Sequence, residues 1–541
     1  MLIQRLRRFP LLVLFLFCLP HLACTQGSLE VELVPTIGQN FDDLEVLKFT
    51  ISGPALQGDP ISFEIDYSKG SAELPELVLN PSAQEKWVLV QAQATRINGP
   101  ATALGVTRFR ISSPNINTTL RVLLSRTQRM GWLTSIENGS QQSKMPVGLV
   151  GHALTTLKDG RILLSGGVRN FTEKQGILNI STLEKDLYLY DPQTGKVSRG
   201  PSMTSPRAFH TATLLKDGRV LIVGGFGFIN NQFTPLSYSA IFDPVQNKVR
   251  EYNTPELKSP RAFHTATALP DGSILFVGGT ASMMKLSGSV KDWAGQTVTA
   301  VEWYDPTTNS IKPALTLNAS QSRFQHRTVA LSSTQILTVG GLFIDGSVSS
   351  TQQARKAFDN ALLFTKKGNT WSMSPLNPPT KSSGRYDHAL VTLTRGNDSW
   401  GLAVGGRNQS HAPLNTLQLW ARNDQLIPVD VKLTTPRYGH TAMVTPDNKL
   451  VVMGGVDSNQ KPVKTCEVFS ISFPGGLPVL KKEPTLDRLM LESKGRYRAQ
   501  AVMHPHSMRI FLFGGATHDT NGKFNALNSV EFYTPAPASA P

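Results

Sequence analysis

The sequence predicts an all-β protein in which a seven-bladed β-propeller follows a small β-sandwich domain. The segment Pro206–Gly225, PRAFHTATLLKDGRVLIVGG, recurs almost unchanged at Pro260–Gly279 as PRAFHTATALPDGSILFVGG. Diglycines end seven apolar runs at a spacing of roughly 50 to 65 residues, a period typical of propellers and solenoids. The last repeat is one strand short, which indicates that a segment from elsewhere in the chain completes its blade.

The chain is long enough for two domains, and its composition is that of a globular protein. It has 541 residues, of which 40% are hydrophobic and 17% are charged, and these values indicate a folded rather than a disordered chain. The N-terminus carries Arg5, Arg7 and Arg8, followed by an apolar run at Phe9–Leu19. This run is too short to cross a bilayer, so residues 1–23 are predicted to be a signal peptide.

The end of this segment, Leu22-Ala23-Cys24, resembles the end of a bacterial lipobox. The resemblance implies a diacylglycerol on Cys24 and an outer-membrane or cell-surface lipoprotein, although His21 stands where that motif usually has an aliphatic residue. The alternative is ordinary signal-peptidase cleavage nearby, which implies a secreted or periplasmic protein. Both alternatives predict export, and they differ in whether a lipid tethers the protein to a membrane.

Cysteine usage and charge narrow the range of partners. Cys18 lies in the signal peptide and Cys466 is alone in the propeller, so no intramolecular disulfide framework is available. Cys466 is expected to be a small buried hydrophobic residue.

The formal net charge is +15, and removal of residues 1–23 takes away three arginines and no acid, which leaves +12. This charge favours anionic polysaccharides, phosphate-bearing polymers or lipid headgroups, unless it is simply scattered for solubility. No nucleic-acid-binding motif is present.

Residues 24–125 are predicted to form the β-sandwich. Strands are expected at residues 29–34, 45–51, 61–65, 86–94, 106–111 and 119–124. They are short and alternating, and Gly, Pro, Asn and Ser clusters separate them, which favours an antiparallel immunoglobulin-like or transthyretin-like sandwich. We expect this domain to be a spacer or docking module between the membrane anchor and the propeller.

Each repeat between residues 130 and 535 is expected to supply one four-stranded blade. In the copy at Pro206–Gly225, two apolar runs flank Lys216-Asp217-Gly218, which is a hairpin signal, and the second run ends at the diglycine. A longer loop then leads to a third strand that ends in an aromatic residue before Asp-Pro, as in Tyr304-Asp305-Pro306. A weaker fourth strand follows.

The last repeat predicts how the ring closes. Its third strand, Asn528–Tyr533, is followed by a Pro- and Ala-rich end that is too poor in apolar residues for another strand, and residues 536–541 are predicted to be a disordered tail. The missing strand is expected at Met130–Thr134, around Trp132. The two ends of the chain would then share one blade and leave no open sheet edge.

The repeated pattern of Arg-x-x-His, an apolar strand, Gly-Gly and an aromatic residue before a turn resembles the kelch repeat. This family includes the seven-bladed central domain of galactose oxidase-like proteins, and the resemblance covers roughly residues 130–535. It implies a kelch β-propeller whose ligand pocket is often lined from the segments that lead into each first strand. It implies little about activity, because one fold hosts many functions.

The face that carries these segments also carries the loops between the second and third strands. Long loops are expected at residues 168–185, 280–299 and 342–355, and binding usually resides in such loops. The candidate ligand contacts are Arg207, Arg261, Arg323, Arg385, Tyr386, Arg437, Tyr438, Arg496 and Tyr497. Guanidinium groups here would grip a carboxylate or sulfate, and the aromatic rings would stack on sugars. The alternative is that each arginine braces the loops between blades.

The repeated histidines are expected to bond backbone groups, and their spread around the axis argues against a metal site. They are His152, His210, His264, His326, His388 and His440. A galactose oxidase-like copper site is poorly supported because Cys466 is the only cysteine of the propeller and no Tyr-His dipeptide occurs there. A sialic acid epimerase-like enzyme would use Asp387 and His388 as acid and base.

The sequence therefore predicts an exported, envelope-associated binding protein that uses the loop-rich face of its propeller and needs no cofactor or metal. The expected partner is a protein or an anionic polysaccharide, with no role for nucleic acid. A carbohydrate-active enzyme is the alternative.

Overall fold

The protein is described by a computed structural model over residues 12–15, 28–35, 44–53, 59–66, 87–95, 101–110, 117–127, 129–131, 143–174, 177–229, 232–281, 296–344, 355–377, 384–421, 426–484, 495–505, 507–518 and 524–536. The predicted lipidation site Cys24, Trp132, the centre of the loop at 280–299 and the tail after residue 536 lie outside these ranges. Within them every regular element is a strand, apart from one 3-10 turn at Pro474–Gly476. The all-β prediction is thus confirmed.

The N-terminal region forms a sheet of seven described strands. They are β1 (Leu12–Phe15), β2 (Ser28–Pro35), β3 (Val46–Ser52), β4 (Ile61–Asp66), β5 (Trp87–Thr95), β6 (Ala101–Arg110) and β7 (Asn117–Arg126), in the order β1-β2-β7-β6-β5-β3-β4. Alternate residues such as Phe49 and Ile51 of β3 and Val88 and Val90 of β5 are buried, which is the pattern of a sheet with one covered face. Strand β1 lies within the predicted signal peptide.

One pairing departs from the antiparallel expectation, because β2 and β7 run parallel. A parallel pair needs a long connection between its strands, and here β3 to β6 supply it. Strands β6 and β7 pair only at Ala103 with Arg126 and at Leu104 with Ser125. This narrow pairing joins the β2 and β7 pair to the rest of the sheet.

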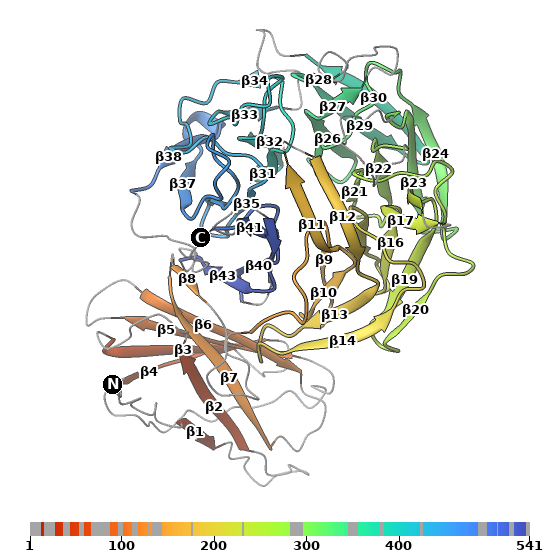
Figure 1. The fold of residues 1–541 in the computed structure, drawn as a ribbon. Coiled ribbons are helices and arrows are strands. Elements are labelled where there is room, and N and C mark those ends of the chain that lie inside the picture. Colours follow the sequence, from red (N-terminus) through yellow and green to blue (C-terminus); the bar gives the residue numbers. More distant parts are fainter. Residues whose placement is uncertain are drawn as a thin grey trace.

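Seven four-stranded sheets follow in the described part of the chain, each with antiparallel neighbours. Blades one to three contain β9 (Ala153–Thr156), β10 (Ile162–Ser165), β13 (Asp186–Tyr190) and β14 (Val197–Ser202); β15 (Thr211–Leu214), β16 (Val220–Val223), β19 (Ser239–Asp243) and β20 (Lys248–Arg250); and β21 (Thr265–Ala268), β22 (Ile274–Val277), β23 (Ala300–Asp305) and β24 (Ser310–Thr316). Figure 1 shows the blades arranged around a ring, with the N-terminal sheet next to β8 and β43 (both bounded below).

Blades four to seven complete the ring. They contain β25 (Arg327–Ala330), β26 (Gln335–Val339), β29 (Ala361–Lys367) and β30 (Thr370–Leu376); β31 (Ala389–Arg395), β32 (Asp398–Val404), β33 (Leu417–Trp420) and β34 (Leu426–Ile427); β35 (Thr441–Val444), β36 (Lys449–Met453), β37 (Cys466–Ser472) and β38 (Val479–Lys482); and β39 (Gln500–Met503), β40 (Ile510–Phe513), β43 (Val530–Thr534) and β8 (Arg129–Gly131).

Strand β8 is the fourth strand of blade seven, where it pairs with β43 through Met130 opposite Tyr533. The blade is also tied to the N-terminal sheet by the buried side chain of Arg509. Its Nη2 atom donates to the carbonyl oxygen of Leu104 at 3.1 Å and to the hydroxyl of Ser125 at 3.2 Å. Blade seven, which β8 completes, is therefore the blade that contacts the N-terminal sheet through Arg509.

The diglycines join each blade to the next. In every blade the second glycine donates its N–H to a carbonyl oxygen of the following blade at 2.8–2.9 Å, and the bond from Gly515 to Leu149 joins blade seven to blade one. The first glycine has a positive φ, and at Gly278 an added Cβ would lie 2.1 Å from the carbonyl oxygen of Arg323. Only glycine tolerates both the conformation and this approach.

Apolar side chains fill the space between neighbouring blades. Across the closure, Ile162 and Tyr190 of blade one pack against Phe511 and Phe513 of blade seven. The Tyr190 and Phe513 rings meet edge to face at 5.1 Å between centroids, a favoured aromatic geometry. Cys466 is buried in the corresponding cluster between blades six and seven, as expected for a small hydrophobic residue.

Candidate functional site

The six repeated arginines lie inside the blades. Their side chains are no more than 1% exposed. In each of these six blades the arginine Nη1 donates to the carbonyl oxygen of the first glycine of the diglycine, at 2.9–3.2 Å. The prediction that Arg207, Arg261, Arg323, Arg385, Arg437 and Arg496 contact a ligand is corrected by this burial, which leaves no accessible surface. Their contacts are those of the bracing alternative.

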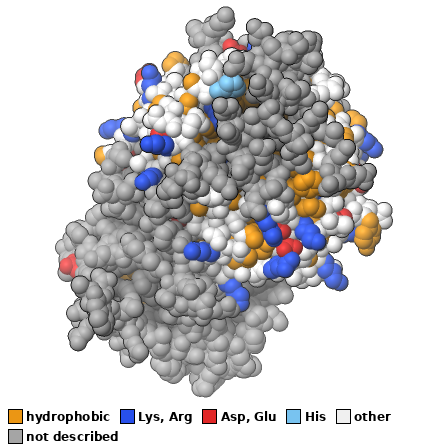
Figure 2. Space-filling view, viewed as in Figure 1, with side chains coloured by type: hydrophobic (Ala, Val, Ile, Leu, Met, Phe, Trp, Pro, Cys, Tyr) orange, Lys and Arg blue, Asp and Glu red, His pale blue; other side chains and the backbone are white. Residues whose placement is uncertain are grey.

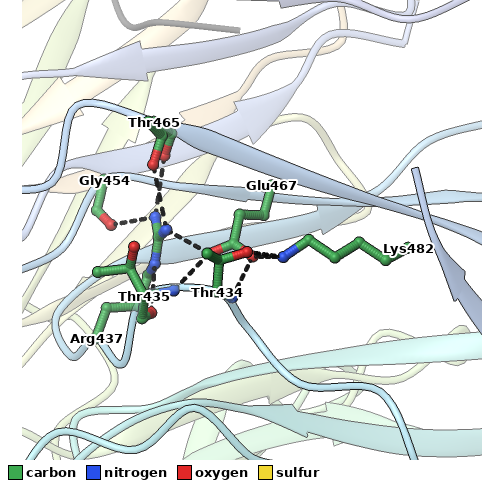
Figure 3. A network of polar contacts seen from close by, with 7 residues as sticks. All are labelled: Thr434, Thr435, Arg437, Gly454, Thr465, Glu467 and Lys482. Carbon is green, nitrogen blue, oxygen red and sulfur yellow. Dashed lines mark hydrogen bonds and ion pairs between the residues drawn. The ribbon is translucent and has the colours of Figure 1, made fainter. Parts of the chain in front are cut away.

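Figure 3 shows one brace, that of Arg437 in blade six. Its Nη1 donates to the carbonyl oxygens of Gly454 and Thr465 at 3.0 Å each, and its Nη2 contacts Glu467 Oε1 at 2.6 Å. Lys482 Nζ contacts the other oxygen of Glu467 at 2.5 Å. Burial alone would raise the pKa of Glu467, but Arg437 and Lys482 lower it. The network therefore joins the second, third and fourth strands of the blade through buried charges.

The repeated histidines are also part of the framework. In three of them the Nε2 atom lies 2.8–3.0 Å from a hydroxyl of the preceding blade: Ser165 for His210, Thr211 for His264 and Thr265 for His326. Burial lowers the pKa of His152 to about 4 and, with help from the neighbouring arginines, that of His264 and His440 to about 3. These imidazoles are therefore neutral at physiological pH.

A channel of about 400 Å³ opens among the innermost strands. Its lining comes from the first strands of all seven blades, β9, β15, β21, β25, β31, β35 and β39, and from the residues that precede them. The residue before each repeated histidine, or before Ala499 in blade seven, has a φ between +51° and +66°. These residues, which we name the channel-mouth ring, are Gly151, Phe209, Phe263, Gln325, Asp387, Gly439 and Arg498.

The backbone of this ring is already hydrogen-bonded around the channel. Phe209 donates its N–H to Gly151 O at 2.8 Å, Gly439 donates to Asp387 O at 3.0 Å, and Arg498 donates to Gly439 O at 2.8 Å. An added peptide strand would therefore find these N–H groups occupied. Recognition at the mouth is left to side chains.

The channel-mouth ring has an apolar side and a charged side. On blades two and three, the rings of Phe209 and Phe263 lie 4.3 Å apart between centroids. On blades five and seven, Asp387 Oδ2 accepts from Arg498 Nη2 at 3.0 Å. The mouth can thus present a ring surface and charged groups to one ligand.

Arg327, the first residue of β25, adds a second cation to the channel. Its Nε donates to His388 O at 3.2 Å, and no described residue accepts a hydrogen bond from its Nη atoms. Burial among the channel walls lowers the pKa of Arg327, against the effect of Asp387. Its side chain is nevertheless exposed to solvent in the channel, where a ligand can reach it.

Arg407 adds a third cation just outside the channel lining. It follows the diglycine of blade five and stacks on Tyr438 of blade six, with its guanidinium carbon 3.4 Å from the ring centroid. Burial alone would lower the pKa of Arg407, but Tyr497, Asp387 and Tyr438 together raise it. In the part of the chain that the structure describes, no hydrogen bond joins its side chain to a carboxylate. Asp387 is bonded to Arg498 and acts to raise the pKa of both Arg327 and Arg407, so three guanidinium groups lie near this carboxylate.

The predicted tyrosines remain on this face, although their rings are buried. The hydroxyl of Tyr386 contacts His411 Nδ1. The hydroxyl of Tyr438 donates to Gln460 Oε1 at 2.8 Å, and that of Tyr497 accepts from Arg498 Nε at 2.5 Å. The burial of these rings corrects the prediction that they stack on sugars, and the tyrosines serve instead as hydroxyl partners of neighbouring side chains.

Sequence reasoning missed Arg327, Arg407 and Arg498 because it looked for residues that every blade shares. These arginines depart from the repeat instead. The counterparts of Arg327 are Ala153, Thr211, Thr265, Ala389, Thr441 and Gln500, and those of Arg407 are Val168, Phe226, Thr280, Leu342, Val456 and Ala516. An alignment of the blades that asked for such departures would have singled them out.

The proposed acid and base are not placed to exchange protons with a substrate. The carboxylate of Asp387 is bonded to Arg498, and His388 is fully buried with a pKa well below its usual value. Among the described residues no group of three His, Cys, Asp or Glu side chains could hold a metal ion. A helix with the length and apolarity to cross a membrane is likewise not found in the described ranges.

Comparisons with known proteins bear on the family. The Kelch motif family matches residues 437–473, from the arginine brace of blade six to the end of its third strand. The F-box/kelch-repeat protein At1g51550 of Arabidopsis thaliana is 25% identical over 248 residues, which make up 42% of this chain and 50% of that protein. The match thus spans half the length of the relative. The solved structure of YjhT is 13% identical, with a TM-score of 0.45, and covers 63% of this chain and 99% of that one. The motif and the relative support a kelch-repeat β-propeller.

Proposed function

We propose that this protein is an exported, envelope-associated binding protein that holds an anionic group at the mouth of its propeller channel. Kelch repeats commonly mediate binding to protein partners, and the signal-like residues 1–23 with Cys24 support export and a lipid tether. The ligand is an anionic carbohydrate or an acidic protein segment.

The observation that carries this proposal is the imbalance of charge at the channel mouth. Arg498 is bonded to the carboxylate of Asp387, and Arg327 and Arg407 lie near enough for that carboxylate to act on their pKa values. Arg327 is exposed in the channel and only its Nε is bonded within the described residues, so a ligand carboxylate or sulfate can accept charge-assisted hydrogen bonds from its Nη atoms. The rings of Phe209 and Phe263 offer an apolar surface across the channel.

The overall charge alone would not give such a site. In Figure 2, the Lys and Arg side chains are scattered over the face in view, and acidic side chains lie among one group of them. Interspersed charges of both signs create no strong single-sign field. Selective binding of an anion therefore has to come from the local cluster at the channel mouth.

The test is calorimetric titration of the purified protein with galacturonate, sulfate and a short Glu-rich peptide. We expect the affinity for these probes to decrease as the salt concentration increases. We also expect Arg327→Ala to reduce this affinity at least about tenfold, since a hydrogen bond to a charged group contributes about 1.5–3 kcal/mol. The matched control is Arg395→Ala, which removes an exposed cation that bonds Phe473 O at the far end of β31.

Equal loss of affinity in the two variants would show that only net charge matters and would refute a site in the channel. Failure of all three probes to bind the parent protein would refute the proposal as a whole.

A further inference from the structure

The walls around the channel mouth are uneven. In four blades the segment between the second and third strands forms a β-hairpin: β11 (Val168–Lys174) with β12 (Ile177–Leu183), β17 (Phe226–Ile229) with β18 (Gln232–Pro235), β27 (Leu342–Ile344) with β28 (Arg355–Ala357), and β41 (Ala516–His518) with β42 (Phe524–Ala526). In blades five and six the same segment is a tight turn, closed by single bridges between Arg407 and Pro413 and between Val456 and Pro462. The described face is therefore lowest over these two blades.

The third arginine lies on this low side. We name the residues there the blade-five/six rim: Tyr386, Arg407, His411, Tyr438 and Gln460. Arg407 lies over the ring of Tyr438, its Nε atom is buried, and no described group accepts a hydrogen bond from that Nε. His411 and Gln460 both have a positive φ in their turns, and each bonds a tyrosine hydroxyl. The rim thus offers a guanidinium, an imidazole and an amide beside ring edges.

The chemistry of the rim suits a hydroxylated chain better than a protein surface. Stable protein interfaces have an apolar core, whereas the exposed large hydrophobic side chains of the described residues are Ile229, Val245, Tyr252, Leu477, Val479 and Met508. None of these lies in the rim or in its two turns. Planar polar side chains that lie beside aromatic rings can instead bond hydroxyls and carboxylates in pairs.

We propose that the blade-five/six rim is a second subsite that binds the continuation of an acidic polysaccharide chain whose end occupies the channel mouth. The chain crosses blades five and six because the wall is low there, and it places one carboxylate at Arg327 and a later one at Arg407. This inference rests on the proposed function, since it extends the same anion site from one sugar acid to a chain.

The experiment compares galacturonate monomer with galacturonate hexamer by calorimetric titration against the full protein. The parent is expected to bind the hexamer about tenfold or more tightly than the monomer. Arg407→Ala should remove most of that difference by weakening the hexamer far more than the monomer, whereas Arg327→Ala should weaken both ligands. Arg395→Ala serves again as the control for net charge, and the thermal midpoint of each variant shows that it is folded.

The outcomes separate the two proposals. Equal affinity for monomer and hexamer, with both lost in Arg327→Ala, overturns the rim subsite and leaves the channel site intact. Equal losses for the two ligands in Arg407→Ala also overturn it, because the arginine would then belong to the first subsite. A hexameric Glu peptide that binds more tightly than the galacturonate hexamer, and depends on Arg407, overturns the polysaccharide in favour of a protein. Binding of no acidic probe refutes the proposed function itself.

Discussion

The six repeated arginines of the blades and the three arginines of the channel face are the same residue in opposite settings. Arg437 is fully buried and bonded to two carbonyl oxygens and to Glu467. Arg327 is exposed in the channel, and its Nε makes one hydrogen bond to a carbonyl oxygen. The first arrangement uses every donor for the fold, whereas the second leaves donors for a ligand.

This difference shows what repetition means in a propeller. Every blade has to join its second strand to its third and to the next blade, so residues that do this recur in nearly every copy. A ligand breaks the symmetry of the ring, and the residues that meet it are needed in one blade only. Residues that depart from the repeat are therefore the better guide to the site.

The largest expected effect is acid unfolding, which acts through the repeated histidines and leaves the arginines of the channel face charged. Because the pKa of His264 is lowered to about 3 in the folded state from about 6.5 when unfolded, the unfolded chain binds protons first. The contribution of neutral His264 to the free energy of unfolding is therefore fully present above pH 6.5 and is lost as the pH decreases toward 3. Urea unfolding at a series of pH values measures this slope.

A variant sharpens that prediction. His264→Gln keeps a group that can bond Thr211 but cannot be protonated, so the unfolding free energy of this variant should fall less steeply with decreasing pH than that of the parent. The same slope in both proteins would show that His264 does not contribute to acid unfolding.

The next effect is that of removing one arginine from each set. Arg437→Ala leaves Glu467 without its main partner inside the blade, and breaking such a buried pair costs about 3–5 kcal/mol of unfolding free energy. Arg327→Ala removes an exposed side chain and should change the free energy of unfolding by less than about 0.5 kcal/mol. Chemical denaturation of the two variants makes the comparison, and similar losses would contradict the division into braces and ligand contacts.

A smaller effect is expected at the glycines that join the blades. Gly278→Ala puts a Cβ 2.1 Å from Arg323 O at a φ of +60°, so backbone strain and the clash together should cost about 2–4 kcal/mol. Gly368→Ala has a φ of +59° with nothing within 4 Å, and should cost only the strain, about 1–2 kcal/mol. Equal thermal shifts in the two variants would mean that the contact between blades adds nothing.

Much of the fold follows from local patterns. Alternating apolar runs, the Lys216-Asp217-Gly218 turn and the diglycines predict strands at nearly the observed positions. The contact of each diglycine with the next blade also has a local signal, because glycine is the residue type that favours the positive φ found at Gly278. The parallel pairing of β2 with β7 has no such signal, since it depends on strands that are distant in the chain.

The sequence by itself determined that the chain is all-β, that kelch-like repeats build it and that an arginine and an aromatic residue precede the first strand of six blades. Only the tertiary structure decided which arginines are available. Arg496 and Arg498 are two residues apart in one segment, yet the backbone turns the first side chain into the blade and the second toward the channel. That choice depends on a positive φ at the channel-mouth ring and on the neighbours each guanidinium meets, and both arise only when the blades close around a common axis.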